Sequence, residues 1–225
     1  MEKSLLNRFC GMPWLYITYA LGIIMFNALI WQWDARSVSQ KLMCMMAIAL
    51  PIHVFEELSW PNGFQFMMNK LVQKSPEPLV NPENRFTDML TNLGAEILFI
   101  VLIFVIPHFE NPLLFVIALF GIGETLIHTL FGILSLRHYK GAGKKTIYAP
   151  GLASAALCML PVSVAAIHYM VLDGTFALPD LGWGLLIMAC IMLFMIRLPM
   201  IISGKVNNPN YAYDTEGYFA KFEHR

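Results

Sequence analysis

Residues 41–60 read KLMCMMAIALPIHVFEELSW, and this stretch sets the class of the protein. Its first two thirds are apolar, and its length matches the about 20 residues that a helix needs to cross a bilayer. Its second half carries a histidine and two glutamates, His53, Glu56 and Glu57, which are costly inside a membrane. The stretch therefore predicts a membrane-spanning helix that carries a polar functional site.

The composition of the whole chain agrees with a membrane location. Hydrophobic residues make up 57% of the 225 residues and charged residues only 13%, whereas soluble domains carry about 25% charged residues. This composition excludes a disordered chain, a nucleic-acid-binding protein and an ordinary cytosolic enzyme. The four cysteines lie in or beside apolar segments without a CxxC pair, so we expect neither a disulfide framework nor a cysteine metal site.

Six apolar segments are long enough to cross a bilayer. They predict a single-domain, all-α integral membrane protein, built as a bundle of six transmembrane helices. Turn signals such as Trp60-Pro61-Asn62-Gly63 and Asp173-Gly174 separate the segments. The predicted spans are residues 13–33, 41–60, 87–106, 112–136, 148–172 and 181–203.

The distribution of basic residues predicts the orientation of the bundle. If the six segments alternate in direction, one side of the membrane receives only Arg36 and Lys41, and Arg197 falls inside the last span. Positively charged loops face the cytoplasm, so both termini are expected to be cytoplasmic. The cytoplasmic side receives the other basic residues: Lys3, Arg8, Lys70, Lys74, Arg85, Arg137, Lys140, Lys144, Lys145, Lys205, Lys221 and Arg225.

Two segments outside the spans have a distinct character. Residues 64–74, FQFMMNKLVQK, are too short to span a membrane, and their apolar residues recur at helical spacing. They predict an amphipathic helix over residues 63–75 that lies on the cytoplasmic interface and shapes the entrance to the site. Residues 204–225 are polar and rich in tyrosine, and they predict a short cytoplasmic tail.

Ionisable residues recur at similar depth, in the cytoplasmic half, on three spans. At 1.5 Å per residue, His53 lies about 10 Å, His128 about 12 Å, Glu96 about 13 Å and Glu124 about 18 Å from the cytoplasmic end. Such residues face the interior of a bundle, so we expect them to face one another. The candidate metal ligands are His53, Glu56, Glu57, Glu96, Glu124 and His128.

A divalent metal ion explains why these residue types are combined. Four bare carboxylates would repel one another and take up protons, whereas carboxylates and imidazoles from facing helices form metal sites in helical bundles. Histidine nitrogens and carboxylate oxygens suit Zn, Fe or Mn better than Mg or Ca. We therefore predict one or two such ions. His108 and His168 fall toward the other side of the membrane and are expected to be packing residues.

Three further residues complete the candidate catalytic set beside Glu57: Asn92, Tyr148 and Arg197. Each also has a purely structural interpretation. Asn92 could bridge helices by hydrogen bonds, Tyr148 could belong to the aromatic belt, and Arg197 could extend its charge to the interface. Arg197 could alternatively pair with the carboxylates or with an anionic head group.

The motifs resemble those of a known family. HVFEE at residues 53–57 and NLGAE at residues 92–96 resemble the HxxEE and NxxxE signatures of the HxxEE-motif family, a group of small bacterial membrane proteins of unknown biochemical function. The resemblance implies a bacterial inner membrane protein and supplies no substrate. A looser likeness is to the CAAX-protease-like intramembrane metalloproteases, which carry a basic residue four positions after their Glu-Glu pair, where this chain has Pro61.

The leading functional hypothesis is a metal-dependent membrane enzyme that hydrolyses a lipid or lipid-like substrate. An ion-activated water would be the nucleophile and Glu57 the general base. One alternative is a carboxylate-bridged di-metal oxidoreductase, which would use the same residues. The other is a divalent-cation or proton-coupled transporter, which is disfavoured because the far halves of the spans are nearly all apolar.

Overall fold

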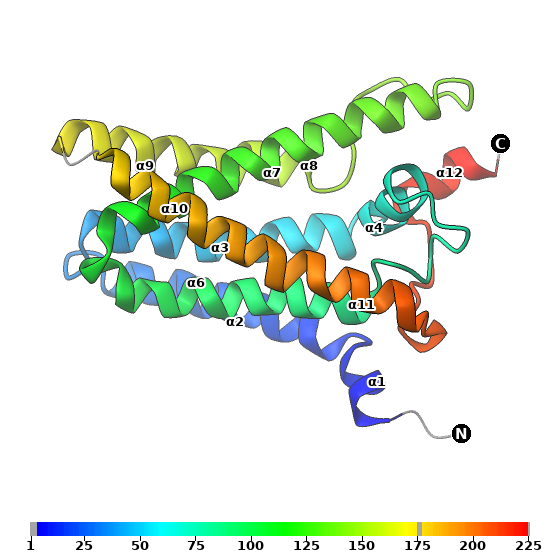
Figure 1. The fold of residues 1–225 in the computed structure, drawn as a ribbon, viewed down its shortest axis with the longest axis horizontal. Helices are drawn as coiled ribbons and strands as arrows, with labels where there is room; N and C mark the ends of the chain where they lie inside the picture. The colour runs from blue at the N-terminus through cyan, green and yellow to red at the C-terminus, as the bar shows by residue number, and fades with distance from the viewer. Residues whose placement is uncertain (1–3, 175–176, 225) are drawn as a thin grey trace.

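Six long helices form an elongated bundle in the computed structural model, which describes residues 4–174 and 177–224 (Figure 1). Each is long and apolar enough to cross a membrane, which confirms the predicted all-α integral membrane fold. Every regular element among the described residues is helical. The six spanning helices are Pro13–Trp31, Val38–Leu58, Arg85–His108, Glu110–His138, Leu152–Asp173 and Leu178–Val206.

Several spanning helices are composite, because a π-helical turn interrupts the α-helical hydrogen bonding. The turns are Met89–Leu93, Ala155–Met159 and Met192–Arg197, and a fourth, Met68–Val72, extends the short helix α4 outside the spans. The α-helical segments are α1 (Leu5–Phe9), α2 (Pro13–Trp31), α3 (Val38–Leu58), α4 (Phe64–Met67), α5 (Arg85–Asp88), α6 (Gly94–Val105), α7 (Glu110–His138), α8 (Leu152–Ser154), α9 (Leu160–Asp173), α10 (Leu178–Ile191), α11 (Leu198–Val206) and α12 (Ala220–Glu223).

Helix α3 lies in the middle of the bundle. It packs between α2 and α6 on one side and α7 and α9 on the other (Figure 1). The most apolar 18-residue window of α3 is 61% buried, whereas that of the last spanning helix is only 11% buried. The residues at the end of α3 therefore lie among neighbouring helices, whereas most of the last spanning helix lies on the outside of the bundle.

The observed helix ends differ from the predicted spans by a few residues. The second span ends at Leu58 rather than at residue 60, and the fourth extends to His138. The fifth begins at Leu152 rather than at residue 148, because Gly151 takes a left-handed conformation with φ of 91° before the helix starts. Tyr148 therefore lies in the loop that precedes this helix.

The C-terminal tail docks on the end of the bundle at which the long loops lie. Phe219 and Phe222 are buried against Tyr139, Ala149 and the α4 segment. Lys70, on the turn after α4, forms an ion pair with Glu223 of α12. The segment predicted to lie on the membrane interface is thus a helix over residues 64–72 that is partly covered by the tail, and its interfacial position stays a prediction.

Candidate metal centre

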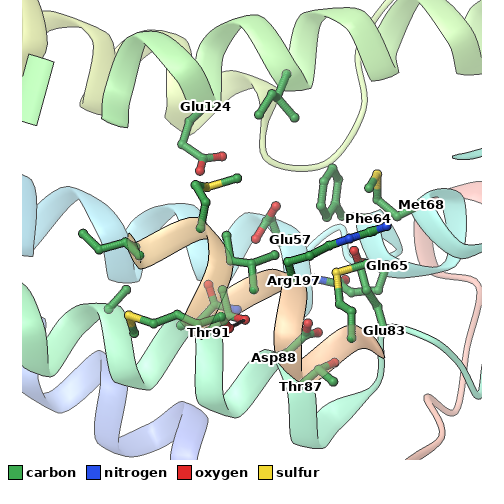
Figure 2. Close-up of a pocket in the computed structure, with 18 of the residues that line it drawn as sticks. Glu57, Phe64, Gln65, Met68, Glu83, Thr87, Asp88, Thr91, Glu124 and Arg197 are labelled. Carbon is green, nitrogen blue, oxygen red and sulfur yellow. Dashed lines mark hydrogen bonds between the residues drawn. The ribbon is translucent and has the colours of Figure 1, made fainter. Parts of the chain in front are cut away.

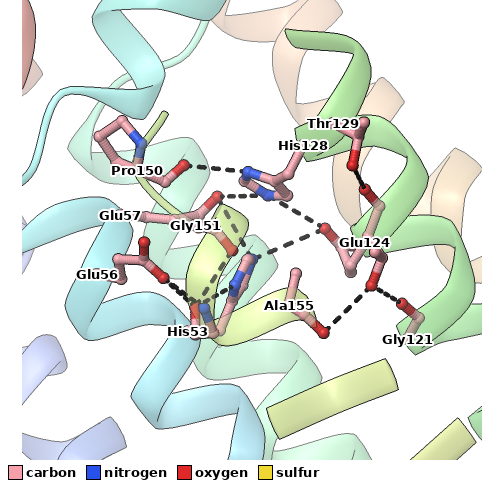
Figure 3. Close-up of polar contacts among 12 residues, drawn as sticks. His53, Glu56, Glu57, Gly121, Glu124, His128, Thr129, Pro150, Gly151 and Ala155 are labelled. Carbon is pink, nitrogen blue, oxygen red and sulfur yellow. Dashed lines mark hydrogen bonds and ion pairs between the residues drawn. The ribbon is translucent and has the colours of Figure 1, made fainter. Parts of the chain in front are cut away.

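Two histidines and two glutamates from α3 and α7 converge near the loop-rich end of the bundle (Figure 3). Oε1 of Glu57 lies 3.5 Å from Nε2 of His53 and 3.2 Å from Nε2 of His128. Oε2 of Glu124 lies 3.7 Å and 3.5 Å from the same two nitrogens. Each helix contributes a histidine and a glutamate four residues apart, because that spacing places both on one helix face.

The outer nitrogens of both histidines are held by hydrogen bonds. Nδ1 of His128 lies 3.1 Å from the carbonyl oxygen of Pro150, which can only accept, so this nitrogen carries the proton. Nδ1 of His53 lies 3.0 Å from the hydroxyl of Ser154, which donates its own proton to Glu56. In its neutral form, with the proton on Nδ1, each imidazole directs the lone pair of Nε2 toward the carboxylates of Glu57 and Glu124.

The loop before α8 fits closely against His128. A Cβ atom added to Gly151 would overlap the imidazole ring, so only glycine permits this approach. The ring of Phe64 covers the same imidazole, with ring centroids 4.5 Å apart. The ring of His128 is thus fixed from several sides.

Glu56 has a different role from its neighbour Glu57. Its carboxylate accepts hydrogen bonds from the hydroxyls of Tyr148 and Ser154 and from the backbone N–H groups of Ala153 and Ser154. With these four donors, Glu56 fixes the start of α8 and the serine that orients His53. Tyr148 acts through Glu56, and the structure does not bring it into the group around the histidines.

The remaining predicted site residues are distributed over two places. Asn92 and Arg197 line the cavity beside the histidines, as Glu57 does. Glu96 is fully buried, and neither carboxylate oxygen has a hydrogen-bond partner, but the structure does not bring it into the histidine–glutamate group. His108 and His168 lie outside the group, but both are exposed, so the structure does not give them the packing role expected from the sequence.

The geometry of the group suits a tetrahedral metal ion. Ligand atoms of His53, Glu124 and His128 lie within 4.8 Å of one another. Oε2 of Glu124 lies 3.7 Å and 3.5 Å from the two histidine nitrogens, close to the about 3.3 Å between neighbouring ligands that Zn–ligand distances of about 2.0–2.1 Å imply. Nε2 of His128 is buried without a hydrogen bond, which is the state of a nitrogen available to a metal. Two histidines and one glutamate are also a known catalytic zinc set.

A cavity of about 640 Å³ opens beside this group (Figure 2). Its walls come from α3, the α4 segment, the α5–α6 helix, α7 and the last spanning helix. The wall is mainly apolar and includes Phe64, Met68, Phe120, Ile127, Phe131 and Met192. The cavity therefore offers an apolar surface to a ligand whose polar part reaches the histidines and glutamates.

Sequence reasoning missed two acidic residues that line this cavity, Glu83 and Asp88. Both are buried, with exposed fractions of 9% and 6%. Burial, together with the negative charge of Glu57, raises the pKa of the Glu83 carboxyl to about 8. The available signal was their position within a few residues of the start of the third span, at the same end as the HVFEE motif.

A family model described as "Protein of unknown function with HXXEE motif" matches residues 44–166, which is more than half of the chain. The matched region contains both histidines and both glutamates of the candidate metal centre. No curated protein and no solved structure matches the chain.

Proposed function

This chain belongs to the family of proteins of unknown function with an HXXEE motif, and from that assignment we propose that it is a metal-dependent integral membrane enzyme. The proposed reaction is hydrolysis of a lipid or lipid-like substrate. The observation that carries the proposal is the convergence of His53, His128 and Glu124 beside a mainly apolar cavity.

His53, His128 and Glu124 would hold one ion of Zn, Fe or Mn. When bound, such an ion supplies Lewis acidity and a water molecule of lowered pKa. Glu57 lies beside both Nε2 atoms and is the general base, which takes a proton from the attacking water. In the second half of the reaction, Glu57 returns this proton to the leaving oxygen, so the carboxylate is regenerated.

The surroundings of the site favour this function over the two alternatives. A di-metal oxidoreductase needs ligands for a second ion, but Glu56 is engaged by four hydrogen bonds and Glu96 lies outside the group. A transporter needs polar residues that lead through the membrane, whereas the wall of this cavity is mainly apolar. The mainly apolar wall instead suits the acyl or isoprenoid chain of a lipid.

Metal analysis tests the proposal directly. We expect the full chain, purified in detergent without chelator, to carry about one Zn, Fe or Mn ion per chain, and His128→Ala to lose it because one ligand is removed. Glu57→Gln should keep the ion and lose hydrolysis, since it removes the base and leaves the three ligands. His168→Ala is the control, because this exposed histidine lies outside the group.

A metal-free protein that gains no thermal stability from any added divalent ion would overturn the proposal. Equal metal content in the wild type and His128→Ala would overturn the assigned ligands. Circular dichroism and size-exclusion profiles separate loss of the ion from loss of the fold.

A further inference from the structure

The cavity holds a second polar group, which the proposed hydrolysis does not use. Glu83 and Asp88 line it beside the start of the third spanning helix (Figure 2). Both side chains are more than nine-tenths buried, and Oδ2 of Asp88 has no hydrogen-bond partner. Within the described part of the chain, no basic side chain forms an ion pair with either of them.

The backbone around these two acids is held firmly. The side-chain oxygen of Asn69 accepts from the N–H of Glu83 at 3.0 Å, and its amide donates to the carbonyl of Glu83 at 2.8 Å. Asn84 caps the next helix by accepting from the N–H of Thr87. The loop therefore holds Glu83, and the capped first turn of α5 holds Asp88, in fixed positions rather than extended into water.

Arg197 lines the same cavity from the last spanning helix, which packs against the start of the third. It lies at the end of the π-helical turn, and Thr91 of the third span donates to the carbonyl of Met195 in that turn at 2.9 Å. In Figure 2 the side chains of Arg197, Glu83 and Asp88 are seen in one cavity with Glu57. The cavity thus presents a guanidinium and two carboxyls to one ligand.

We propose that Glu83, Asp88 and Arg197 form a head-group subsite that selects a lipid bearing both an ammonium and a phosphate group. The carboxyls of Glu83 and Asp88 take the ammonium, which offers three N–H donors. The guanidinium of Arg197 takes the phosphate, for which its planar fork is suited. The apolar wall takes the chains of the lipid. This inference rests on the proposed function, because it names the substrate class of the same cavity.

The charges of the cavity indicate a ligand whose head group carries an ammonium. Two buried carboxyls without a basic partner are costly in a membrane protein, and an ammonium ion compensates them when the ligand binds. A second divalent metal is the competing occupant. Among the described residues, Glu83 and Asp88 do not belong to a group of three or more close metal-ligating side chains, which disfavours a metal ion. Two carboxyl groups are enough to bind an ammonium.

Binding of short-chain lipids to the detergent-solubilised full chain tests the subsite. The probes are dihexanoyl phosphatidylethanolamine and dihexanoyl phosphatidylglycerol, which differ in the ammonium group, and binding is measured by calorimetry. Hydrogen bonds to a charged group contribute about 1.5–3 kcal/mol, so the wild type should prefer the ethanolamine lipid by about tenfold or more. Glu83→Gln with Asp88→Asn should abolish the preference, and Arg197→Met should weaken both lipids.

Glu77→Gln is the matched control, because Glu77 is an exposed acid in the same loop and does not line the cavity. It should leave the preference unchanged. Free phosphoethanolamine should bind at least about tenfold more weakly than the lipid, since it lacks the chains. Equal binding of free head group and lipid would overturn the lipid assignment.

Metal content is measured on the same samples, so that this inference and the proposed function fail separately. We expect Glu83→Gln with Asp88→Asn to keep the ion held by the histidines. Loss of one metal ion per chain in this variant would make the subsite a cation site and overturn the proposal. Equal affinity of the wild type for both lipids would also overturn it, even if the double variant did not fold.

Discussion

At the scale of single residues, the candidate centre depends on which nitrogen of each histidine carries a proton. The hydrogen bonds to Ser154 and to the carbonyl of Pro150 hold the protons on Nδ1 of His53 and His128. The opposite nitrogens are then free to accept a metal ion. Ser154 and Pro150 are therefore as much a part of the site as the ligands.

Ser154→Ala should weaken metal binding by about 10–100-fold, because it removes the acceptor that fixes the tautomer and orientation of His53. The affinity is measured by competition with a fluorescent chelator. Ser163→Ala is the control, since Ser163 is also buried on the same spanning helix but bonds to the carbonyl of Ile117. Unchanged affinity in Ser154→Ala would show that the serine does not orient the imidazole.

Gly151→Ala should lower metal affinity through a steric effect. The added methyl group would overlap the imidazole of His128, and φ of 91° is unfavourable for alanine. Gly174→Ala separates the two causes, because φ is 67° there but a Cβ atom would meet nothing within 4 Å. Gly174→Ala should cost stability, of order 1 kcal/mol, and leave metal binding intact. A similar loss of metal in both variants would contradict the steric explanation.

At the scale of elements, two π-helical turns shape the cavity. Met89–Leu93 and Met192–Arg197 lie on facing helices and are joined by the hydrogen bond from Thr91 to the carbonyl of Met195. Such turns are frequent at functional sites because the extra residue redirects side chains. Asn92 and Arg197 lie in these turns and line the cavity, which a regular helical wheel does not predict.

The docked tail is the second feature at this scale. Lys144 donates hydrogen bonds to the carbonyl of Tyr148 and to the hydroxyl of Tyr218. Burial, followed by the charge of Lys221, lowers the pKa of the Lys144 ammonium to about 8. Because Tyr148 donates to Glu56, the tail is connected to the centre through a chain of contacts. Undocking of the tail would remove the contact between Tyr218 and Lys144, which helps to hold the loop before α8.

Docking of the tail should weaken in acid. Burial acts to raise the pKa of Glu223, but the hydrogen bonds from Lys70 and Tyr139 and the charge of Lys70 hold that pKa below its usual value. A carboxylate with a lowered pKa contributes stability that is complete above its unfolded value of about 4.3 and is lost as the pH falls through the folded value. We expect the distance between spin labels at residues 141 and 215 to lengthen in that range.

Glu223→Gln is the matched comparison for this acid effect. The variant has no carboxylate at this position, so its docking should be weaker at pH 7 and should change less on acidification. If the wild type and the variant lose docking in parallel, another group controls the pH response.

At the scale of the whole molecule, the even number of spans places both termini on the same side of the membrane. Helices α1 and α12 lie at the same end of the bundle, next to the long loops (Figure 1). The excess of lysine and arginine at this end predicts that it faces the cytoplasm.

Cysteine labelling tests this topology. In a variant without the four native cysteines, single cysteines at Glu110 and Asp173 should react with a membrane-impermeant reagent added from outside. A cysteine at Lys140 is the control at the opposite end of α7, and it should react only after the membrane is permeabilised. Labelling of residue 140 from outside would invert the orientation.

The sequence by itself determined the membrane class, the six spans and most of the residues that the structure brings together around the two histidines. A span is recognisable because the bilayer demands a fixed length of apolar residues, which is a local property of the chain. His53 and Glu57 are four residues apart, as are Glu124 and His128, and this spacing predicted that the two members of each pair share a helix face. Both pairs lie in the candidate metal centre.

Only the tertiary structure decided which acids share the site. Glu56 and Glu57 are adjacent in sequence, but a helix turns about 100° per residue, so one bonds to α8 and the other lies beside the histidines. Glu96 is buried in its spanning helix but lies outside the predicted group, whereas Glu83 lines the cavity from a folded loop. The rotation of each helix about its axis and the path of its loops depend on long-range packing, which the periodicity of a single segment does not encode.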